Sequence, residues 1–106
     1  LRTIGLKLPD ENLNSFHVYH LFTVYHPKRN SIINKLNKIK IETRVIYPYP
    51  IHKMKAYNKI IYNQKNLKNS EIKSKGIFCL PLYPELKNQD VKSICKNLKK
   101  IIEKEL

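Results

Sequence analysis

The residues best suited to chemistry lie in one short stretch, residues 41–57, with the sequence IETRVIYPYPIHKMKAY. Two tyrosine–proline pairs precede His52, and Lys53 follows it directly. Proline fixes the backbone φ angle near about −65°, so a loop that contains several prolines loses little entropy when it holds a side chain towards a ligand. The pattern indicates a rigid loop that presents His52, with Tyr47 and Lys53 beside it.

A purely structural interpretation of the same stretch stays open. Prolines that follow a strand often only end it, because they cannot donate to a sheet ladder. Tyr47 and Tyr49 would then cover the edge of the core, and His52 would cap a short helix. Lys53 and Lys55 have the same two interpretations: they suit an anionic ligand, and they also suit an ordinary solvated surface.

The charge of the chain is strongly positive, with 21 lysines and arginines against 8 acidic residues and a formal net charge of +13. The lysines run from Lys7 to Lys104 without forming a cluster. The positive charge still makes a small basic RNA-binding α+β module the competing function. In such a module Tyr19 and Phe22 of FHVYHLF would stack on bases. The segment GIFCLPLYP lacks the basic, glycine-rich signature of such modules, which argues against nucleic acid as a partner.

Cysteines and histidines do not form a recognisable metal or disulfide pattern. Cys79 lies in an apolar run and Cys95 on an apolar helix face, so both are expected to be buried thiols. His17 and His20 are three residues apart in a predicted strand and would point to opposite faces of the sheet. We expect no metal site.

Hydrophobic periodicity predicts alternating strands and helices. Strands are expected over residues 16–25, 41–45 and 76–84, and helices over residues 27–40, 52–62 and beyond residue 88. Residues 1–15 are expected to form an extended lead-in, and residues 63–75 a polar surface connection with one turn of helix near its end. The strand at residues 76–84 is apolar throughout, which predicts burial on both faces.

The last helix has the clearest periodicity in the chain. Asn88 is expected to cap it. Its predicted buried stripe consists of Val91, Ile94, Cys95, Leu98, Ile101 and Ile102.

These elements predict one α+β domain over residues 1–106, a small three-stranded sheet with two main helices packed largely on one face. No apolar run approaches the roughly 18 residues that a membrane span requires, and the N-terminus lacks the apolar core of a signal peptide. We expect a cytoplasmic protein. Because the chain begins with leucine, we treat it as processed or as a piece of something longer.

Four motifs in order resemble the C-terminal small domain of the DegT/DnrJ/StrS family of pyridoxal-phosphate (PLP)-dependent sugar-nucleotide aminotransferases. They are VYHLFTV, a helix that opens near Arg29, IETRVIYPYPIHKMKAY and GIFCLPLYPELKNQDVKSI, and together they span about residues 15–102. The family pattern Thr-x-Val-His-Tyr-Pro-x-Pro-x-His-x-Gln-Pro-Ala-Tyr is matched at Thr43, Val45, Tyr47, Pro48, Pro50, His52, Ala56 and Tyr57. Ile46, Met54 and Lys55 depart from it.

The resemblance implies that this chain is the C-terminal domain of an aspartate-aminotransferase-like enzyme. Tyr47, His52 and Lys53 would contact a nucleotide-linked keto-sugar, which receives an amino group from an amino acid such as glutamate. The Schiff-base lysine and the PLP cradle of the family belong to a large upstream domain, so this chain would carry no catalytic or cofactor-binding residue and would be inactive alone. The full-length enzyme would be a homodimer that serves amino-sugar or cell-surface polysaccharide biosynthesis.

Overall fold

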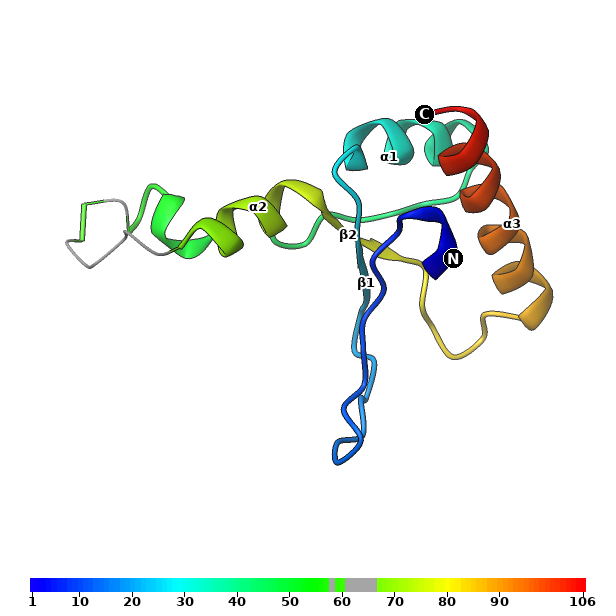
Figure 1. The fold of residues 1–106 in the computed structure, drawn as a ribbon, viewed down its shortest axis with the longest axis horizontal. Coiled ribbons are helices and arrows are strands. Elements are labelled where there is room, and N and C mark those ends of the chain that lie inside the picture. Colours follow the sequence, from blue (N-terminus) through cyan, green and yellow to red (C-terminus); the bar gives the residue numbers. More distant parts are fainter. Residues whose placement is uncertain (58, 61–66) are drawn as a thin grey trace.

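The computed structural model describes residues 1–57, 59–60 and 67–106. It combines helices with a small sheet, which confirms the predicted α+β class (Figure 1). The elements in chain order are the 3₁₀ helix η1 (Arg2–Ile4), β1 (Phe22–Tyr25), α1 (Arg29–Lys38), the 3₁₀ helix η2 (Ile51–Lys53), α2 (Lys68–Gly76), β2 (Ile77–Leu80) and α3 (Asn88–Lys104).

The sheet of the described residues has two strands, not the three that we predicted. β1 and β2 are antiparallel, with Phe22 opposite Leu80 and Tyr25 opposite Ile77. The expected strand over residues 41–45 is reduced to a single bridge, in which Arg44 and Cys79 exchange backbone hydrogen bonds of 3.2 and 2.7 Å. One end of this segment is bound elsewhere, because the amide of residue 41 donates to a carbonyl of α1 at 3.0 Å.

The first strand is shorter than predicted. We expected residues 16–25, but only Phe22–Tyr25 pair with β2. Residues before them belong to a loop that projects away from the body of the domain (Figure 1). There Tyr19 has a positive φ of 48°, and its amide donates to Nδ1 of His17 at 2.8 Å. A strand needs a paired neighbour, and β2 is too short to supply one beyond residue 22.

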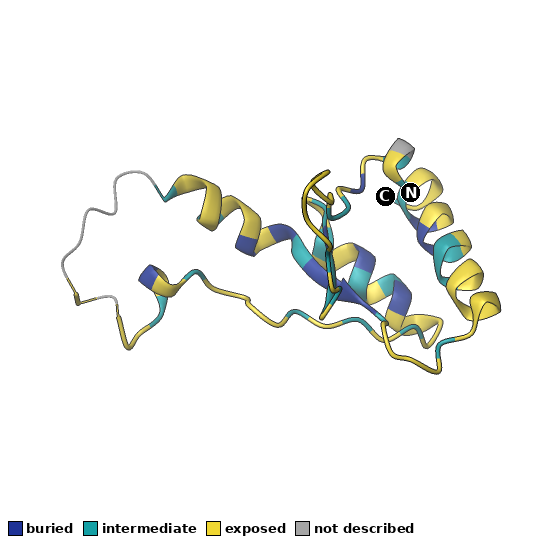
Figure 2. Cartoon of the chain, turned by 90° about the horizontal axis from the view of Figure 1, so that it is seen from below, coloured by how far each residue is buried: buried dark blue, intermediate teal, exposed yellow. Residues whose placement is uncertain are grey.

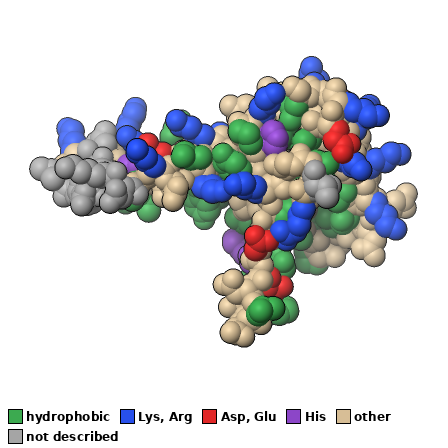
Figure 3. All heavy atoms as spheres, in the orientation of Figure 1, with side chains coloured by type: hydrophobic (Ala, Val, Ile, Leu, Met, Phe, Trp, Pro, Cys, Tyr) green, Lys and Arg blue, Asp and Glu red, His purple; other side chains and the backbone are tan. Residues whose placement is uncertain are grey.

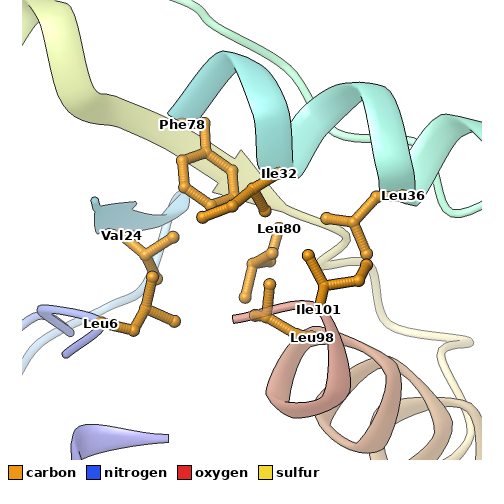
Figure 4. Close-up of a cluster of buried hydrophobic side chains, with 8 residues drawn as sticks. All are labelled: Leu6, Val24, Ile32, Leu36, Phe78, Leu80, Leu98 and Ile101. Atoms are coloured by element: carbon orange, nitrogen blue, oxygen red, sulfur yellow. The ribbon is translucent and has the colours of Figure 1, made fainter. Parts of the chain in front are cut away.

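The core lies where β1, β2, α1 and α3 meet (Figure 4). Its buried side chains are Leu6, Val24, Ile32, Leu36, Phe78, Leu80, Leu98 and Ile101. The helical spacing of the α1 and α3 residues brings each set onto one face, and the close-up shows both helices directing these side chains towards the two strands. Part of the apolar face of each main helix therefore contributes to the core.

The fully buried members of the predicted α3 stripe lie only in its C-terminal half. Leu98 and Ile101 are buried, whereas Val91 at the other end is exposed, and the remaining members are half-buried. Cys95 is thus not buried as expected, although Cys79 is. The capping prediction was also wrong, since Asn88 is the first residue of α3 and Lys87, in an extended conformation, occupies the cap position.

The region between β1 and β2 also differs from the prediction. The short helix expected over residues 52–62 is only the single turn η2, as far as residue 60, and residues 58 and 61–66 lie outside the described part. The helical turn expected near residues 70–75 is the longer helix α2. Its Glu71 lies in the first turn, where a negative charge favours a helix N-terminus.

Gly76 ends α2 at a position without room for a side chain. A Cβ built there would overlap the ring of Tyr25 and lie 2.9 Å from the carbonyl oxygen of His26. We expect Gly76→Ala to lower the free energy of unfolding by about 1–3 kcal/mol through overpacking. Urea titration of the 106-residue chain measures this. Ser70→Ala, at an exposed position of α2, is the control; equal stability of the two variants would contradict the prediction.

Candidate functional site

The proline-rich segment, defined as residues 45–53, runs from the Arg44–Cys79 bridge along α2 to η2 (Figure 2). Its three predicted site residues differ in exposure. Tyr47 is 62% exposed, the Lys53 side chain is 54% exposed, and His52 is only 6% exposed. The segment therefore offers Tyr47 and Lys53 to the outside, while His52 turns inwards against α2.

His52 is held by a carboxylate from α2. Its Nε2 lies 2.9 Å from Oε1 of Glu71, and Nζ of Lys53 lies 3.6 Å from the same oxygen. An ionised carboxylate only accepts hydrogen bonds, so Nε2 of His52 is the donor. This contact joins two residues that are separated by 19 positions in the sequence, and it ties the proline-rich segment to the first turn of α2.

The surroundings favour the ionised form of Glu71. The hydrogen bond from His52 holds the pKa of the Glu71 carboxyl below its ordinary value of 4.5. Burial acts in the opposite direction, and the positive charge of Lys53 lowers the pKa further. The carboxylate is therefore negatively charged at neutral pH and can hold both neighbours.

A pH dependence follows from this lowered pKa. The contribution of Glu71 to stability is present above its unfolded-state pKa and is lost as the pH falls through the lower folded-state value. We expect the stability difference between the wild type and Glu71→Gln to shrink as the pH falls below about 4.5. Urea titrations of both proteins between neutral pH and pH 3 test this; a difference that does not change with pH would contradict it.

The other end of α2 is fixed to α1. Nη1 of Arg29 donates to the carbonyl oxygens of Ser74 at 2.7 Å and Ile77 at 3.1 Å. Ser74 in turn donates through Oγ to the carbonyl oxygen of Glu71 at 2.9 Å. The bond to Ser74 satisfies a carbonyl group in the last turn of α2, which lacks a partner within the helix, and the bond to Ile77 reaches the first residue of β2. Arg29 thus connects the core helix α1 to the helix that holds His52.

A hollow of about 620 Å³ lies between α2, the start of α1 and the proline-rich segment. Its lining includes three cationic side chains and one carboxylate, together with polar groups and prolines. These residues are Arg29, Asn30, Pro48, Tyr49, Pro50, Lys53, Glu71, Ser74 and Lys75. The excess of positive charge at this hollow suits an anionic ligand. Basic side chains are also distributed over much of the rest of the visible face (Figure 3), as the sequence predicts.

A second hollow, of about 650 Å³, is lined mostly by residues from the segments 40–46 and 79–86 and from the first half of α3. It contains none of the predicted site residues. We therefore take the hollow beside the proline-rich segment as the candidate site.

The structure brings together some of the predicted residues and adds others. Lys53 lines the hollow and meets His52 at Glu71, whereas Tyr47 lies on the exposed surface outside the lining. Sequence reasoning missed Glu71 because it assigned residues 63–75 to a polar connection. A usable signal was present, since Glu71 is one of only 8 acidic residues in the chain.

Three further observations bear on the kind of site. Within residues 1–57, 59–60 and 67–106, no group of three or more histidines, cysteines or acidic residues could hold a metal ion. In the same part of the chain, no helix combines the length and the apolar character of a membrane span. The aromatic residues expected to stack on RNA bases do not form an alternating strand; Tyr19 and Phe22 stack on each other, with ring centroids 5.8 Å apart.

Comparison with known proteins decides the family. The sequence model of the DegT/DnrJ/EryC1/StrS aminotransferase family matches residues 2–99. The chain belongs to this family. The match includes the whole proline-rich segment, α2 and the residues that line the hollow.

Curated relatives and solved structures resemble the chain over most of its length. It is 30% identical over 85% of its length to a pleiotropic regulatory protein of Geobacillus stearothermophilus, and 34% identical over 77% to dTDP-3-amino-3,4,6-trideoxy-alpha-D-glucose transaminase of Micromonospora megalomicea. The crystal structure of Streptomyces venezuelae DesV with a ketimine intermediate superimposes with a TM-score of 0.87, at 26% identity over 94% of the chain. The chain spans only 24%, 22% and 27% of the length of these three proteins.

Proposed function

We propose that this chain is the C-terminal domain of a cytoplasmic, homodimeric, PLP-dependent aminotransferase that acts on a nucleotide-linked keto-sugar. The family match over residues 2–99 carries the proposal. Relatives named as transaminases of dTDP- and UDP-linked sugars support the substrate class. The product would serve amino-sugar or cell-surface polysaccharide biosynthesis.

The described lysines do not fit a Schiff-base role. Such a lysine needs a desolvated position and a cradle for the cofactor, but every lysine that the structure describes is exposed except Lys35, which is half-buried and 3.5 Å from Glu105. We therefore propose that the catalytic lysine belongs to the remainder of the polypeptide, in a large upstream domain. PLP bound there supplies the chemistry that moves the amino group from donor to sugar.

The part of this chain in the reaction is to bind and position the sugar nucleotide, through Tyr47, His52 and Lys53. Tyr47 and Lys53 are exposed on the proline-rich segment, where a hydroxyl and an ammonium group are available to a ligand. Lys53 lies at the hollow with the excess of positive charge, and such charge stabilises an anionic diphosphate. His52 is the buried residue of the segment, and its contact with Glu71 of α2 holds the segment in position.

The full-length enzyme, meaning the longer polypeptide that carries this domain, tests the proposed function. It is purified with PLP and assayed with glutamate and with dTDP- and UDP-linked keto-sugars. We expect glutamate to convert the cofactor to its aminated form and a keto-sugar nucleotide to reverse the conversion. Absence of amino transfer to every such sugar nucleotide would refute the proposal.

The 106-residue chain alone is expected to form no specific imine with PLP, because its described lysines lie at the surface. Treatment with PLP and borohydride, followed by peptide mass mapping, should give diffuse labelling in the chain and a single labelled lysine in the full-length enzyme. Stoichiometric labelling of one lysine of the isolated chain would show that the cofactor site is in this domain.

A further inference from the structure

Within the part of the chain that the structure describes, Glu71 contacts two consecutive residues of the proline-rich segment, His52 and Lys53. η2 is one turn long, held internally by the bonds from the Lys53 amide to the Pro50 carbonyl at 2.9 Å and from the Met54 amide to the Ile51 carbonyl at 3.0 Å. A helical turn of this length is not stable by itself. Its side-chain contacts with α2 are therefore what fix its position, and the Glu71 carboxylate supplies them.

The contacts form a continuous path from the core to the segment. Arg29 of α1 binds the C-terminal end of α2 through the carbonyl oxygens of Ser74 and Ile77. At the N-terminal end of the same helix, Oε1 of Glu71 meets Nε2 of His52 and Nζ of Lys53. Because α2 is a rigid element fixed at one end, the position of its first turn determines the position of η2.

We propose that Glu71 is a positioning residue for sugar-nucleotide binding: its carboxylate holds His52 and Lys53 so that the proline-rich segment keeps the orientation that receives the substrate. This inference rests on the proposed function and names a residue that acts through its neighbours. In this proposal Glu71 acts on the substrate through His52 and Lys53, although it is itself among the residues that line the hollow.

The burial of His52 makes the contact strong enough for this role. A buried polar group without a hydrogen-bond partner is costly, so removal of the Glu71 carboxylate favours a conformation in which the imidazole reaches water. Such a movement shifts Lys53, the adjacent residue, and Pro50 at the start of η2. The rim of the hollow would then lose its order.

Two substitutions separate the two contacts of Glu71. In Glu71→Gln the amide oxygen still accepts a hydrogen bond from Nε2 of His52, but the charge that attracts Lys53 is lost. In Glu71→Ala both contacts are lost. The matched control is Glu103→Ala, which removes a carboxylate from α3, where it lies 4.0 Å from Nζ of Lys99.

The experiment measures steady-state kinetics of the full-length enzyme and the rate of cofactor amination by glutamate. We expect Glu71→Ala to raise the KM for the nucleotide sugar about 10-fold to 100-fold, the range for a lost hydrogen bond to a charged group. Glutamate-driven amination should be nearly unchanged, because that half-reaction needs little from the outer pocket. Glu71→Gln should recover most of the lost affinity, and Glu103→Ala should match the wild type.

Results that differ from these expectations would refute the positioning role, its basis in the hydrogen bond to His52, or the proposed function. An unchanged KM in Glu71→Ala, or an equal loss in both half-reactions, refutes the positioning role while the proposed function stands. A loss in Glu71→Gln as large as in Glu71→Ala refutes the hydrogen bond to His52 as its basis. If the alanine variant does not fold, a rise in KM of about 10-fold or more in Glu71→Gln refutes it in the same way. A wild-type enzyme that accepts no sugar nucleotide refutes the proposed function, and this inference with it.

Discussion

Replacing Phe78 with alanine is expected to remove about 3–5 kcal/mol from the free energy of unfolding of the 106-residue chain. Phe78 is the largest of the fully buried side chains, with 1% of its surface exposed, and it lies on β2 close to Ile32 of α1 (Figure 4). Its removal loses apolar burial and leaves a cavity that the rigid surroundings fill only in part. Small domains have a total stability of about 5–15 kcal/mol, so this loss would be a large fraction of the total.

The same substitution elsewhere in the chain provides the control. Phe16 is 88% exposed on the projecting loop, and Phe16→Ala is expected to change stability by less than about 0.5 kcal/mol. Urea titrations followed by circular dichroism compare the two variants with the wild type. A loss in Phe78→Ala as small as that in Phe16→Ala would contradict the placement of Phe78 in the core.

The main helices and the buried strand could be predicted because their patterns are local and strong. The spacing of Ile32 and Leu36 on α1, and of Leu98 and Ile101 on α3, is the spacing of one helix face, and these four residues are buried. The apolar run that contains β2 was likewise recognisable from composition. Such patterns determine which residues face inwards before any tertiary contact is known.

The strand predictions failed where a strand depends on a partner elsewhere in the sequence. Composition favoured an extended backbone over residues 16–25, but β2 offers only Ile77–Leu80 as a partner. Residues 41–45 have the required alternation, yet only Arg44 reaches Cys79. β2 ends at Leu80, opposite Phe22, and the next residue is Pro81, which cannot donate to a ladder, so residues before Phe22 find no partner in β2. At its other end β2 directly follows α2, which continues to Gly76 and was predicted as a polar connection.

The sequence predicted a rigid backbone for the proline-rich segment, but not the side-chain contacts that this segment makes with α2. The prolines indicated a rigid segment, and residues 48–50 do line a hollow. The sequence could not show which side chain faces inwards, because the partner of His52 is 19 residues away on a helix that the sequence only hinted at. Tyr47 and Tyr49 do not cover the core edge, since both are exposed, and His52 lies within η2 instead of capping a helix.

Replacing His52 with alanine in the full-length enzyme is also expected to have a large effect, in this case on activity. We expect His52→Ala to slow the half-reaction with the sugar nucleotide about 10-fold to 100-fold, because the segment loses its charged hydrogen bond to Glu71. Amination of the cofactor by glutamate should be much less affected, since it needs little from the outer pocket. Stability should fall by about 1–2 kcal/mol, because a buried side chain is truncated.

His52→Gln separates the loss of the contact from the loss of the ring. The amide nitrogen of glutamine can donate to Oε1 of Glu71 as Nε2 of the imidazole does, so this variant should regain part of the sugar-nucleotide rate. The two half-reactions are followed separately by the absorbance of the cofactor, with a melting curve on each preparation. A lowered melting temperature with both rates unchanged would show that His52 only supports the fold. An equal loss in both half-reactions would place its effect on the catalytic centre as a whole, not on the binding of the sugar nucleotide.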